Sequence, residues 1–148
     1  MDEKVDHGPI IKQFEEEILP TDTLESLAKK LFELAADKIL EVLDANQSTA
    51  QDDSQATFTN TLTRRDGYID LSIVNGQPSM VNLERMIRAY FPWPGIWTRA
   101  IINNKSSIIK LLPSNMIQVE GKNPMSYIDF ANGYSEGNEI LKSLNLVE

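Results

Sequence analysis

Basic side chains gather in the middle of this chain, where phosphate groups could bind to them. Residues 64–122 hold eight basic and four acidic side chains, a local charge of +4, although the whole chain carries −8. Local potential, rather than net charge, decides whether a surface attracts a polyanion such as nucleic acid. The eight are Arg64, Arg65, Arg85, Arg88, Arg99, Lys105, Lys110 and Lys122. Charge alone still favours the plainer interpretation, a mixed and solvated surface.

Two tryptophans lie within the same stretch and could stack on bases. Aromatic rings do so with little regard to sequence, since every base has a π-face. Trp93, however, stands between two prolines. For Trp93, and also for Trp97, we favour a place in the core over a place at a nucleic-acid surface.

Composition excludes several kinds of site. The chain has no cysteine and a single histidine, His7, which rules out disulfides, thiolate metal sites and multi-histidine metal sites. The lack of cysteine fits a reducing compartment, and we expect a cytoplasmic protein. No apolar run approaches the roughly 18 residues of a membrane helix, and the acidic first residues do not read as a signal peptide. We therefore predict neither a metal nor a membrane partner.

The N-terminal third reads as a strand followed by a long helix. Apolar residues predict the strand within residues 8–20. Asp22 and Glu25 have capping-box spacing at the start of a helix over residues 22–44. Its apolar residues recur every three or four positions and form one stripe: Leu24, Leu27, Leu31, Leu34, Ala35, Ile39, Val42 and Leu43. One strand is too small a partner for this stripe, so the pattern indicates the tail of a larger α/β domain, and an exposed stripe would favour dimerisation.

The rest of the chain reads as a linker and then as short strands with turn signals. The polar, aperiodic residues 46–61 predict the linker. Turns are predicted at Asn75-Gly76 and over residues 103–106. Strands are predicted over 68–74, 96–102, 107–112 and 115–120, and helices over 80–90 (capped by Ser79), 127–133 and 137–144. The pattern predicts a small antiparallel barrel or curled sheet that carries helices.

Residues 121–134 close a strand and open a short helix. Ser126 can cap this helix, and Asp129 can return a hydrogen bond to the Ser126 backbone N–H. Met125 and Phe130 have the spacing of a hydrophobic staple. Gly133 is placed to end the helix with a positive φ.

Four segments resemble motifs of known enzymes, and three of them resemble the signatures of methionyl-tRNA formyltransferases. Residues 121–134 resemble that family's GKKPMS-x-x-DF-x-x-GY, residues 87–95 its IRA-x-x-PWPG, and residues within 51–70 its QD…AT…LT-x-x-DG-x-ID. The three segments follow the family's order. Residues 5–10 also resemble the LD-x-GPI motif that ends the catalytic half of folate-dependent formyltransferases.

This resemblance implies an enzyme that transfers a formyl group from 10-formyltetrahydrofolate to the amino group of methionyl initiator tRNA. Residues 1–45 would end its Rossmann-like catalytic domain, residues 46–61 would be a linker, and residues 62–148 would form its OB-like C-terminal domain. The expected fold is therefore mainly β with flanking helices, an OB-like barrel preceded by a strand and a long helix left over from the α/β domain. The chain would be a fragment that is inactive alone and binds no cofactor, of an enzyme that is monomeric at full length.

The resemblance also implies roles for single residues. Asp6 matches the family's catalytic aspartate, a carboxylate suited to orienting an imidazole or a water during proton transfer. The family's catalytic asparagine and histidine have no match in this chain. The family's C-terminal domain contacts tRNA, and A-form RNA is recognised largely by its backbone and shape. The resemblance implies tRNA contacts at Arg64, Arg88 and Lys122, and for Lys122 a solvated turn residue is an equal alternative. The basic stretch adds four further expected contacts, Arg65, Arg99, Lys105 and Lys110. For Arg88, an ion pair with a nearby carboxylate is the favoured alternative.

Two other interpretations stay open. A sugar-nucleotide N-formyltransferase also carries a PWPG turn in its C-terminal domain, although residues 121–134 argue against it. The chain could also be a stand-alone barrel that binds RNA or another partner without catalysis. Thr61 and Asn123 replace residues that are commonly basic in methionyl-tRNA formyltransferases, which weakens the case for RNA binding.

Overall fold

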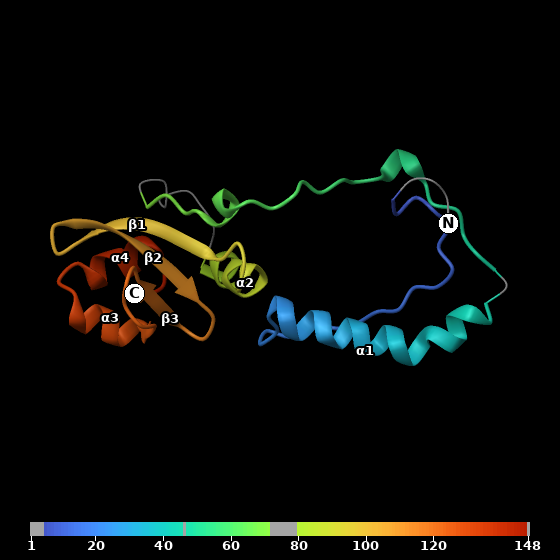
Figure 1. The fold of residues 1–148 in the computed structure, drawn as a ribbon, viewed down its shortest axis with the longest axis horizontal. Helices are drawn as coiled ribbons and strands as arrows, with labels where there is room; N and C mark the ends of the chain where they lie inside the picture. Colours follow the sequence, from blue (N-terminus) through green and yellow to red (C-terminus); the bar gives the residue numbers. More distant parts are fainter. Residues whose placement is uncertain (1–4, 46, 72–79, 148) are drawn as a thin grey trace. The chain divides into compact units, whose positions relative to one another are not determined.

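The computed structural model of the chain describes residues 5–45, 47–71 and 80–147 (Figure 1). The chain divides into two compact units, an N-terminal unit, Met1–Thr61, and a C-terminal unit, Leu62–Glu148. The turn predicted at Asn75-Gly76 and the helix cap predicted at Ser79 lie outside the described residues.

The long helix predicted for the N-terminal unit is α1, Leu24–Leu43. Its N-cap is Thr23, whose Oγ1 accepts a hydrogen bond from the Ser26 N–H at 3.3 Å, while the Thr23 N–H donates to Ser26 Oγ at 3.0 Å. The predicted box of Asp22 and Glu25 is therefore wrong by one residue. A serine hydroxyl at the third helical position returns the bond here in place of a carboxylate.

Asp22 instead fixes the approach to α1. One carboxylate oxygen accepts from the Leu19 N–H and from Lys30 Nζ, both at 2.8 Å, and the other accepts from Ser26 Oγ at 2.9 Å. The side chain is only 5% exposed. These bonds, with that of the Lys30 ammonium first among them, hold the pKa of Asp22 below its ordinary value.

The strand predicted within residues 8–20 is wrong. Ile10 forms an isolated antiparallel bridge with Thr49, with 2.8 Å between N and O in both directions, and residues 11–19 are exposed without regular secondary structure. A strand must pair its backbone N–H and C=O groups with a neighbouring strand. In the described part of this unit, only Thr49 supplies such a pairing.

The apolar stripe of α1 stays largely exposed. None of the residues of this helix is buried, and Leu31 and Leu43 of the stripe are 47% and 72% exposed. Phe32 and Leu40, which lie outside the stripe, are 77% and 72% exposed. Residues 47–61 are exposed as well, and they contain one short 3₁₀ helix, η1, Asp53–Gln55. The described N-terminal unit thus consists of one capped helix and a long irregular segment.

The C-terminal unit contains an antiparallel sheet and three α-helices among its described residues. The strands are β1, Ile96–Ile102, β2, Lys105–Leu112, β3, Met116–Val119, and β4, Met125–Ser126, in the spatial order β1-β2-β3-β4. The helices are α2, Met80–Tyr90, α3, Tyr127–Gly133, and α4, Gly137–Ser143, and a 3₁₀ helix, η2, spans Arg64–Gly67. With α1, the described chain has four α-helices and one four-stranded antiparallel sheet, a mixed architecture with more helix than the expected mainly-β fold.

The β1–β2 hairpin turns more tightly than predicted. Asn103 and Asn104 both have positive φ, 49° and 61°, and Ile102 pairs directly with Lys105. Two central residues with positive φ are typical of a type I′ turn, which asparagine tolerates. The turn therefore has two residues rather than four, and β2 begins at Lys105 instead of Ser107.

Helix α3 begins as predicted but ends differently. The Asp129 N–H donates to Ser126 Oγ at 3.0 Å, and the Ser126 hydroxyl, rather than its backbone N–H, donates to Asp129 Oδ2 at 2.7 Å. The positive φ predicted at Gly133 is wrong, because Gly133 closes the helix and the next residue, Tyr134, has extended backbone with φ −130°.

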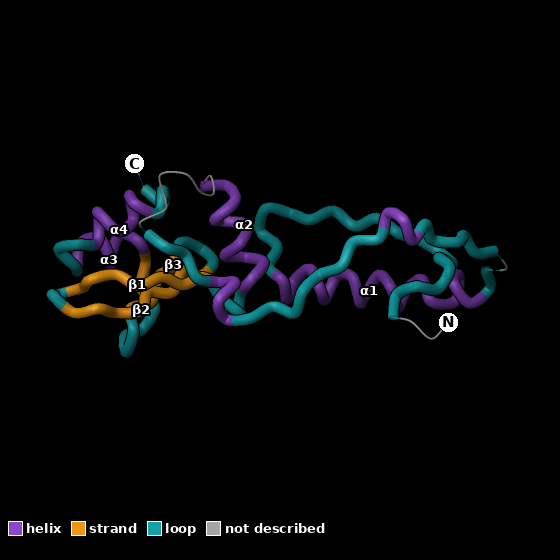
Figure 2. Tube along the Cα trace, turned by 90° about the horizontal axis from the view of Figure 1, so that it is seen from above, coloured by secondary structure: helices purple, strands orange, loops and turns teal. Residues whose placement is uncertain are grey.

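One hydrophobic core joins the sheet to α2, α3 and α4. In β1 the even-numbered residues are buried, and in β2 Ile109 and Leu111 are buried. Alternate strand residues point to opposite faces, so these side chains share one face of the sheet. Figure 2 shows α3 and α4 on one side of the strands. The buried hydrophobic residues are Leu83, Ile87, Ile96, Ala100, Ile102, Ile109, Leu111, Ile117, Val119, Tyr127, Phe130, Ile140, Leu141 and Leu144.

Candidate nucleic-acid interface

The face of the sheet opposite the core carries two of the predicted basic residues. We call it the outer face and define it by Trp97, Arg99, Ile101, Ile108, Lys110 and Gln118. Trp97 pairs with Lys110 across β1 and β2, and Lys110 pairs with Gln118 across β2 and β3. Arg99 lies two residues beyond Trp97 on the same strand and is exposed. An indole, an ammonium and an amide therefore form one row across three strands.

Arg64 is held beside this row by Trp97. The Trp97 indole Nε1 donates to the Arg64 carbonyl oxygen at 2.9 Å, and the Arg64 guanidinium lies 5.7 Å from the centre of the Trp97 ring. Tyr68 contacts the same indole, with 4.8 Å between ring centres. A guanidinium over an indole face is a favourable cation–π arrangement. Arg64, from η2, thus joins a surface otherwise made by the sheet.

Backbone pairing fixes the segment that carries Arg64. The Ile69 N–H donates to the Trp97 carbonyl at 2.9 Å, and the hydroxyl of the fully buried Thr98 donates to the Ile69 carbonyl at 2.6 Å. Tyr68 forms a parallel bridge with Trp97. Of the strand predicted over residues 68–74, the described residues 68–71 form this isolated bridge, and residues 72–74 lie outside the described residues.

Asp66 stabilises the start of η2. Its Oδ2 accepts from the Thr63 N–H at 2.6 Å and from the Thr63 hydroxyl at 2.8 Å. The bond from the Thr63 N–H is the main reason that the pKa of Asp66 lies below its ordinary value. The acidic residue that follows the arginines is therefore a cap for the turn and does not neutralise Arg64 by an ion pair.

The loop over residues 91–95 approaches η2 closely. A Cβ on Gly67 would collide with the Gly95 carbonyl oxygen, so only glycine permits this contact. The Gly95 N–H donates to the Tyr90 carbonyl at 2.9 Å, and Gly95 has a positive φ of 69°. Pro94 is buried, whereas Trp93 is 55% exposed. The prediction that Trp93 lies in the core is wrong, because the proline beside it turns inward instead. The same prediction for Trp97 is also wrong, because Trp97 is half-buried on the sheet face opposite the core.

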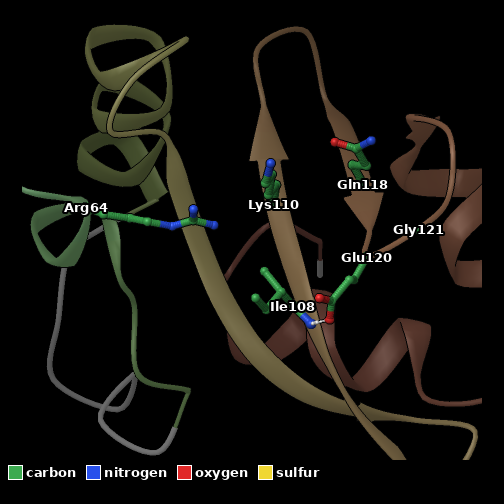
Figure 3. A pocket seen from close by; sticks show the side chains of 6 residues that line it. All are labelled: Arg64, Ile108, Lys110, Gln118, Glu120 and Gly121. Atoms are coloured by element: carbon green, nitrogen blue, oxygen red, sulfur yellow. Dashed lines mark hydrogen bonds between the residues drawn. The ribbon is translucent and has the colours of Figure 1, made fainter.

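Two adjoining hollows lie along the row. The larger, about 310 Å³, is lined by Arg64, the 91–95 loop, Trp97, Lys110 and Gln118. The smaller, about 170 Å³, is lined by Arg64, Ile108, Lys110, Gln118, Glu120 and Gly121, and Figure 3 shows Arg64 extending across β1 toward Lys110. The Glu120 carboxylate accepts from the Ile108 N–H at 3.3 Å. Arg64 and Lys110 face both hollows, and neither has a carboxylate partner among the described residues.

The other predicted contacts lie away from these hollows. Arg88 of α2 pairs with Glu84 at 3.0 Å, and its side chain is only 15% exposed. Arg65 is exposed on η2, and Lys105 follows the β1–β2 turn. Lys122 lies in the turn after β3, where its carbonyl accepts from Gln118 Nε2 at 2.9 Å. The structure thus brings Arg64, Arg99 and Lys110 to one face and leaves these four outside the row.

Two polar residues of the hollows, Gln118 and Glu120, were not predicted as site residues from the sequence. Gln118 stands between the buried Ile117 and Val119, so the alternation of β3 could have placed it on the outer face. The alternation of β3 does not predict that Glu120 lines a hollow. Its carboxylate is held there by the hydrogen bond from Ile108 of β2, a neighbouring strand.

Asp6, the predicted catalytic residue, lies in the N-terminal unit. It is exposed and has a positive φ of 58°. Gln51 Nε2 donates to the carbonyls of Asp6 and Gly8 at 2.9 and 2.6 Å, and His7 Nε2 lies 2.9 Å from Asp53 Oδ2. Residues 51–53 therefore hold the loop that carries Asp6 in its left-handed conformation.

Neither a metal site nor a membrane span is found in the part of the chain that the structure describes. No group of three or more histidine, cysteine or acidic side chains there could hold a metal ion. None of the helices described there is long and apolar enough to cross a bilayer.

The chain is similar to curated proteins named methionyl-tRNA formyltransferase. It is 37% identical to that of Roseiflexus sp. over 95% of this chain and 43% of the relative. It is 45% identical to that of Roseiflexus castenholzii over 64% of this chain and 30% of the relative, and 32% identical to that of Treponema pallidum over 88% and 51%. No protein-family model matches the chain. The resemblance predicted from the motifs is confirmed, and the chain spans about half or less of the length of these relatives.

Proposed function

We propose that this relative of the methionyl-tRNA formyltransferases is the C-terminal part of such an enzyme. The full-length cytoplasmic, monomeric protein transfers a formyl group from 10-formyltetrahydrofolate to the amino group of methionyl initiator tRNA. Residues 1–45 end the Rossmann-like catalytic domain, residues 46–61 are the linker, and residues 62–148 are an OB-like domain that contacts the tRNA. The similarity over 95% of the chain supports this reading.

The single observation that carries the proposed tRNA contact is the convergence of Arg64, Lys110 and Arg99 beside one sheet face. Arg64 and Lys110 come from segments more than forty positions apart, and both line the same hollows. Cations fixed on a face of a rigid sheet suit the phosphate backbone of A-form RNA, which proteins recognise by shape and charge.

The remaining basic residues take lesser parts in this proposal. Arg65, Lys105 and Lys122 lie at the periphery of the interface and add to its potential. Arg88 contributes least, since a phosphate would have to displace Glu84 from its guanidinium.

Asp6 is proposed as a catalytic position of the full-length enzyme. Its carboxylate would orient the group that takes the proton from the attacking amine. The backbone carbonyls of Asp6 and Gly8 are already engaged by Gln51. The fragment itself is proposed to bind no formyl donor, and we derive no step through the donor. The isolated chain is expected to be inactive.

The test is a titration of the 148-residue chain with initiator tRNA and with an elongator tRNA at low and moderate salt. We expect binding that weakens as salt rises, because bound phosphates release counterions. Lys110→Ala should lower the salt slope by about one. Arg85→Ala, a matched charge change on α2, should leave the slope unchanged. Failure to bind either tRNA at low salt would overturn the proposal.

A further inference from the structure

We propose that the larger hollow binds one unpaired nucleotide, with its base stacked on Trp93 and its phosphate between Arg64 and Lys110. This inference rests on the proposed function, because it assumes that the outer face meets RNA. It adds that the feature recognised is a single-stranded nucleotide rather than the backbone of a helix.

Trp93 offers a surface for the base. More than half of this large aromatic side chain is exposed, at 55%, although the loop that carries it lines a hollow. Exposed indoles beside cationic grooves are the usual platforms for single-stranded nucleic acid. Bases in a helix stack on each other and cannot present a face to such a ring, so the platform selects unpaired nucleotides.

The platform is held in place before any ligand arrives. Gly95 is tied to Tyr90 by a backbone hydrogen bond of 2.9 Å, and its carbonyl packs against Gly67. Pro94 of the same loop is buried, which further restricts the movement of the loop. An aromatic ring on a preorganised loop loses little conformational freedom when a base stacks on it.

The charges of the hollow suit a phosphate next to that base. Arg64 and Lys110 line it without a carboxylate partner among the described residues, and the Arg64 guanidinium already lies over Trp97. Glu120 lines only the smaller hollow, where its carboxylate repels phosphate, so the larger hollow suits a phosphate better. Gln118 donates through Nε2 to the Lys122 carbonyl, which leaves Oε1 to accept from the base or the ribose hydroxyl.

The size of the hollow agrees with one nucleotide. At about 310 Å³ it lies at the lower end of small-molecule sites. It accommodates one base and its phosphate beside Trp93, whereas a double helix would meet only the cations at its rim.

The experiment compares two RNA probes, single-stranded hexaadenylate and a blunt-ended duplex of twelve base pairs, on the full chain. Hexaadenylate should quench the fluorescence of Trp93, and the duplex should bind without this quenching. Trp93→Ala should weaken hexaadenylate binding about ten-fold and leave the duplex affinity unchanged. Trp93→Phe, which keeps a ring, should retain most of the affinity and show only the signal of Trp97.

The outcomes separate the two proposals. If wild type binds both probes and Trp93→Ala binds hexaadenylate equally well, stacking is refuted while the phosphate surface stands. An equal loss for both probes would also refute it, since Trp93 would then act only through the shape of the loop. If neither probe binds at low salt, the proposed function fails as well. Quenching by decaproline but not by hexaadenylate would assign the hollow to a proline-rich peptide and overturn the inference.

Discussion

The two units differ in how far their apolar side chains are buried. In the C-terminal unit, fourteen hydrophobic side chains are buried in one core, and Phe130 is fully inaccessible. In the described part of the N-terminal unit, the single buried side chain is a carboxylate, that of Asp22, while Phe32 and Leu40 are exposed. One unit is therefore stabilised by packing, and the other by caps and ion pairs around one helix. The periodicity of a helix shows which face could be buried, not that a partner is present.

The largest expected effect contrasts two phenylalanines. Phe130→Ala should lower the free energy of unfolding of the C-terminal unit by about 4 kcal/mol, because it leaves a cavity in a closed core. Phe32→Ala, at a position that is 77% exposed, should change stability by less than about 0.5 kcal/mol. Urea unfolding followed by tryptophan fluorescence and by far-UV circular dichroism would measure both. Equal effects would remove the distinction between the units.

Next in size is the contact between Gly67 and Gly95. Gly67→Ala should destabilise the C-terminal unit by about 2 kcal/mol, since the added methyl group must displace a backbone carbonyl. Gly133→Ala is the matched control: a Cβ there meets no atom within 4 Å, and the change should stabilise slightly. Thermal unfolding of the two variants would distinguish them, and a neutral Gly67→Ala would contradict the close approach.

Low pH should reduce the helicity of α1, because protonation of Asp22 weakens its bonds at the start of this helix. The folded-state pKa of Asp22 lies below the ordinary value of 3.8, mainly because of the bond from Lys30. Its contribution is therefore complete above about pH 4 and is lost as pH falls through the folded-state pKa. Lys30→Met should move the acid loss of helicity to higher pH, and circular dichroism across pH 6 to 2 would detect it. A midpoint identical to that of the wild type would show that the bond from Lys30 does not hold Asp22 charged.

The smallest expected effect concerns an exposed ion pair of α1. Lys29 Nζ and Glu33 Oε1 lie 3.8 Å apart with both side chains largely exposed. Glu33→Gln should cost no more than about 0.5 kcal/mol, and less at high salt. A larger loss in a salt titration of helicity would mean that surface charge, rather than the cap at Thr23, stabilises α1.

Local signals explain why most elements could be predicted. The stripe of α1, the serine that caps α3 and the turn after β1 are signals that act within a few residues. The predicted ends of β1 and α3 match the structure, and those of α1 differ by two residues and one residue. The predicted strand within residues 8–20 failed because a strand depends on a partner elsewhere in the chain. The positive φ predicted at Gly133 is wrong because a helix can also end in a residue with extended backbone, here Tyr134.

The candidate site also depends on contacts between distant parts of the chain, which the sequence did not predict. Charge located Arg64, Arg99 and Lys110, but their meeting depends on the register of β1 against β2. That register follows from the two-residue turn at Asn103 and Asn104. The predicted four-residue loop would shift β2 by two residues and place Leu112, rather than Lys110, opposite Trp97. The exposure of Trp93 depends on which side chain of its loop turns inward, which composition does not reveal.

The hydrogen bond between Trp97 and Arg64 fixes the end of the irregular segment that precedes η2. Residues 56–62 are exposed and have no regular secondary structure, and the next two residues, Thr63 and Arg64, are already fixed to Asp66 and Trp97. A segment of seven residues can span at most about 25 Å when fully extended. It begins beside the outer face, so under the proposed function RNA bound there is kept at a high effective concentration for whatever the preceding residues carry.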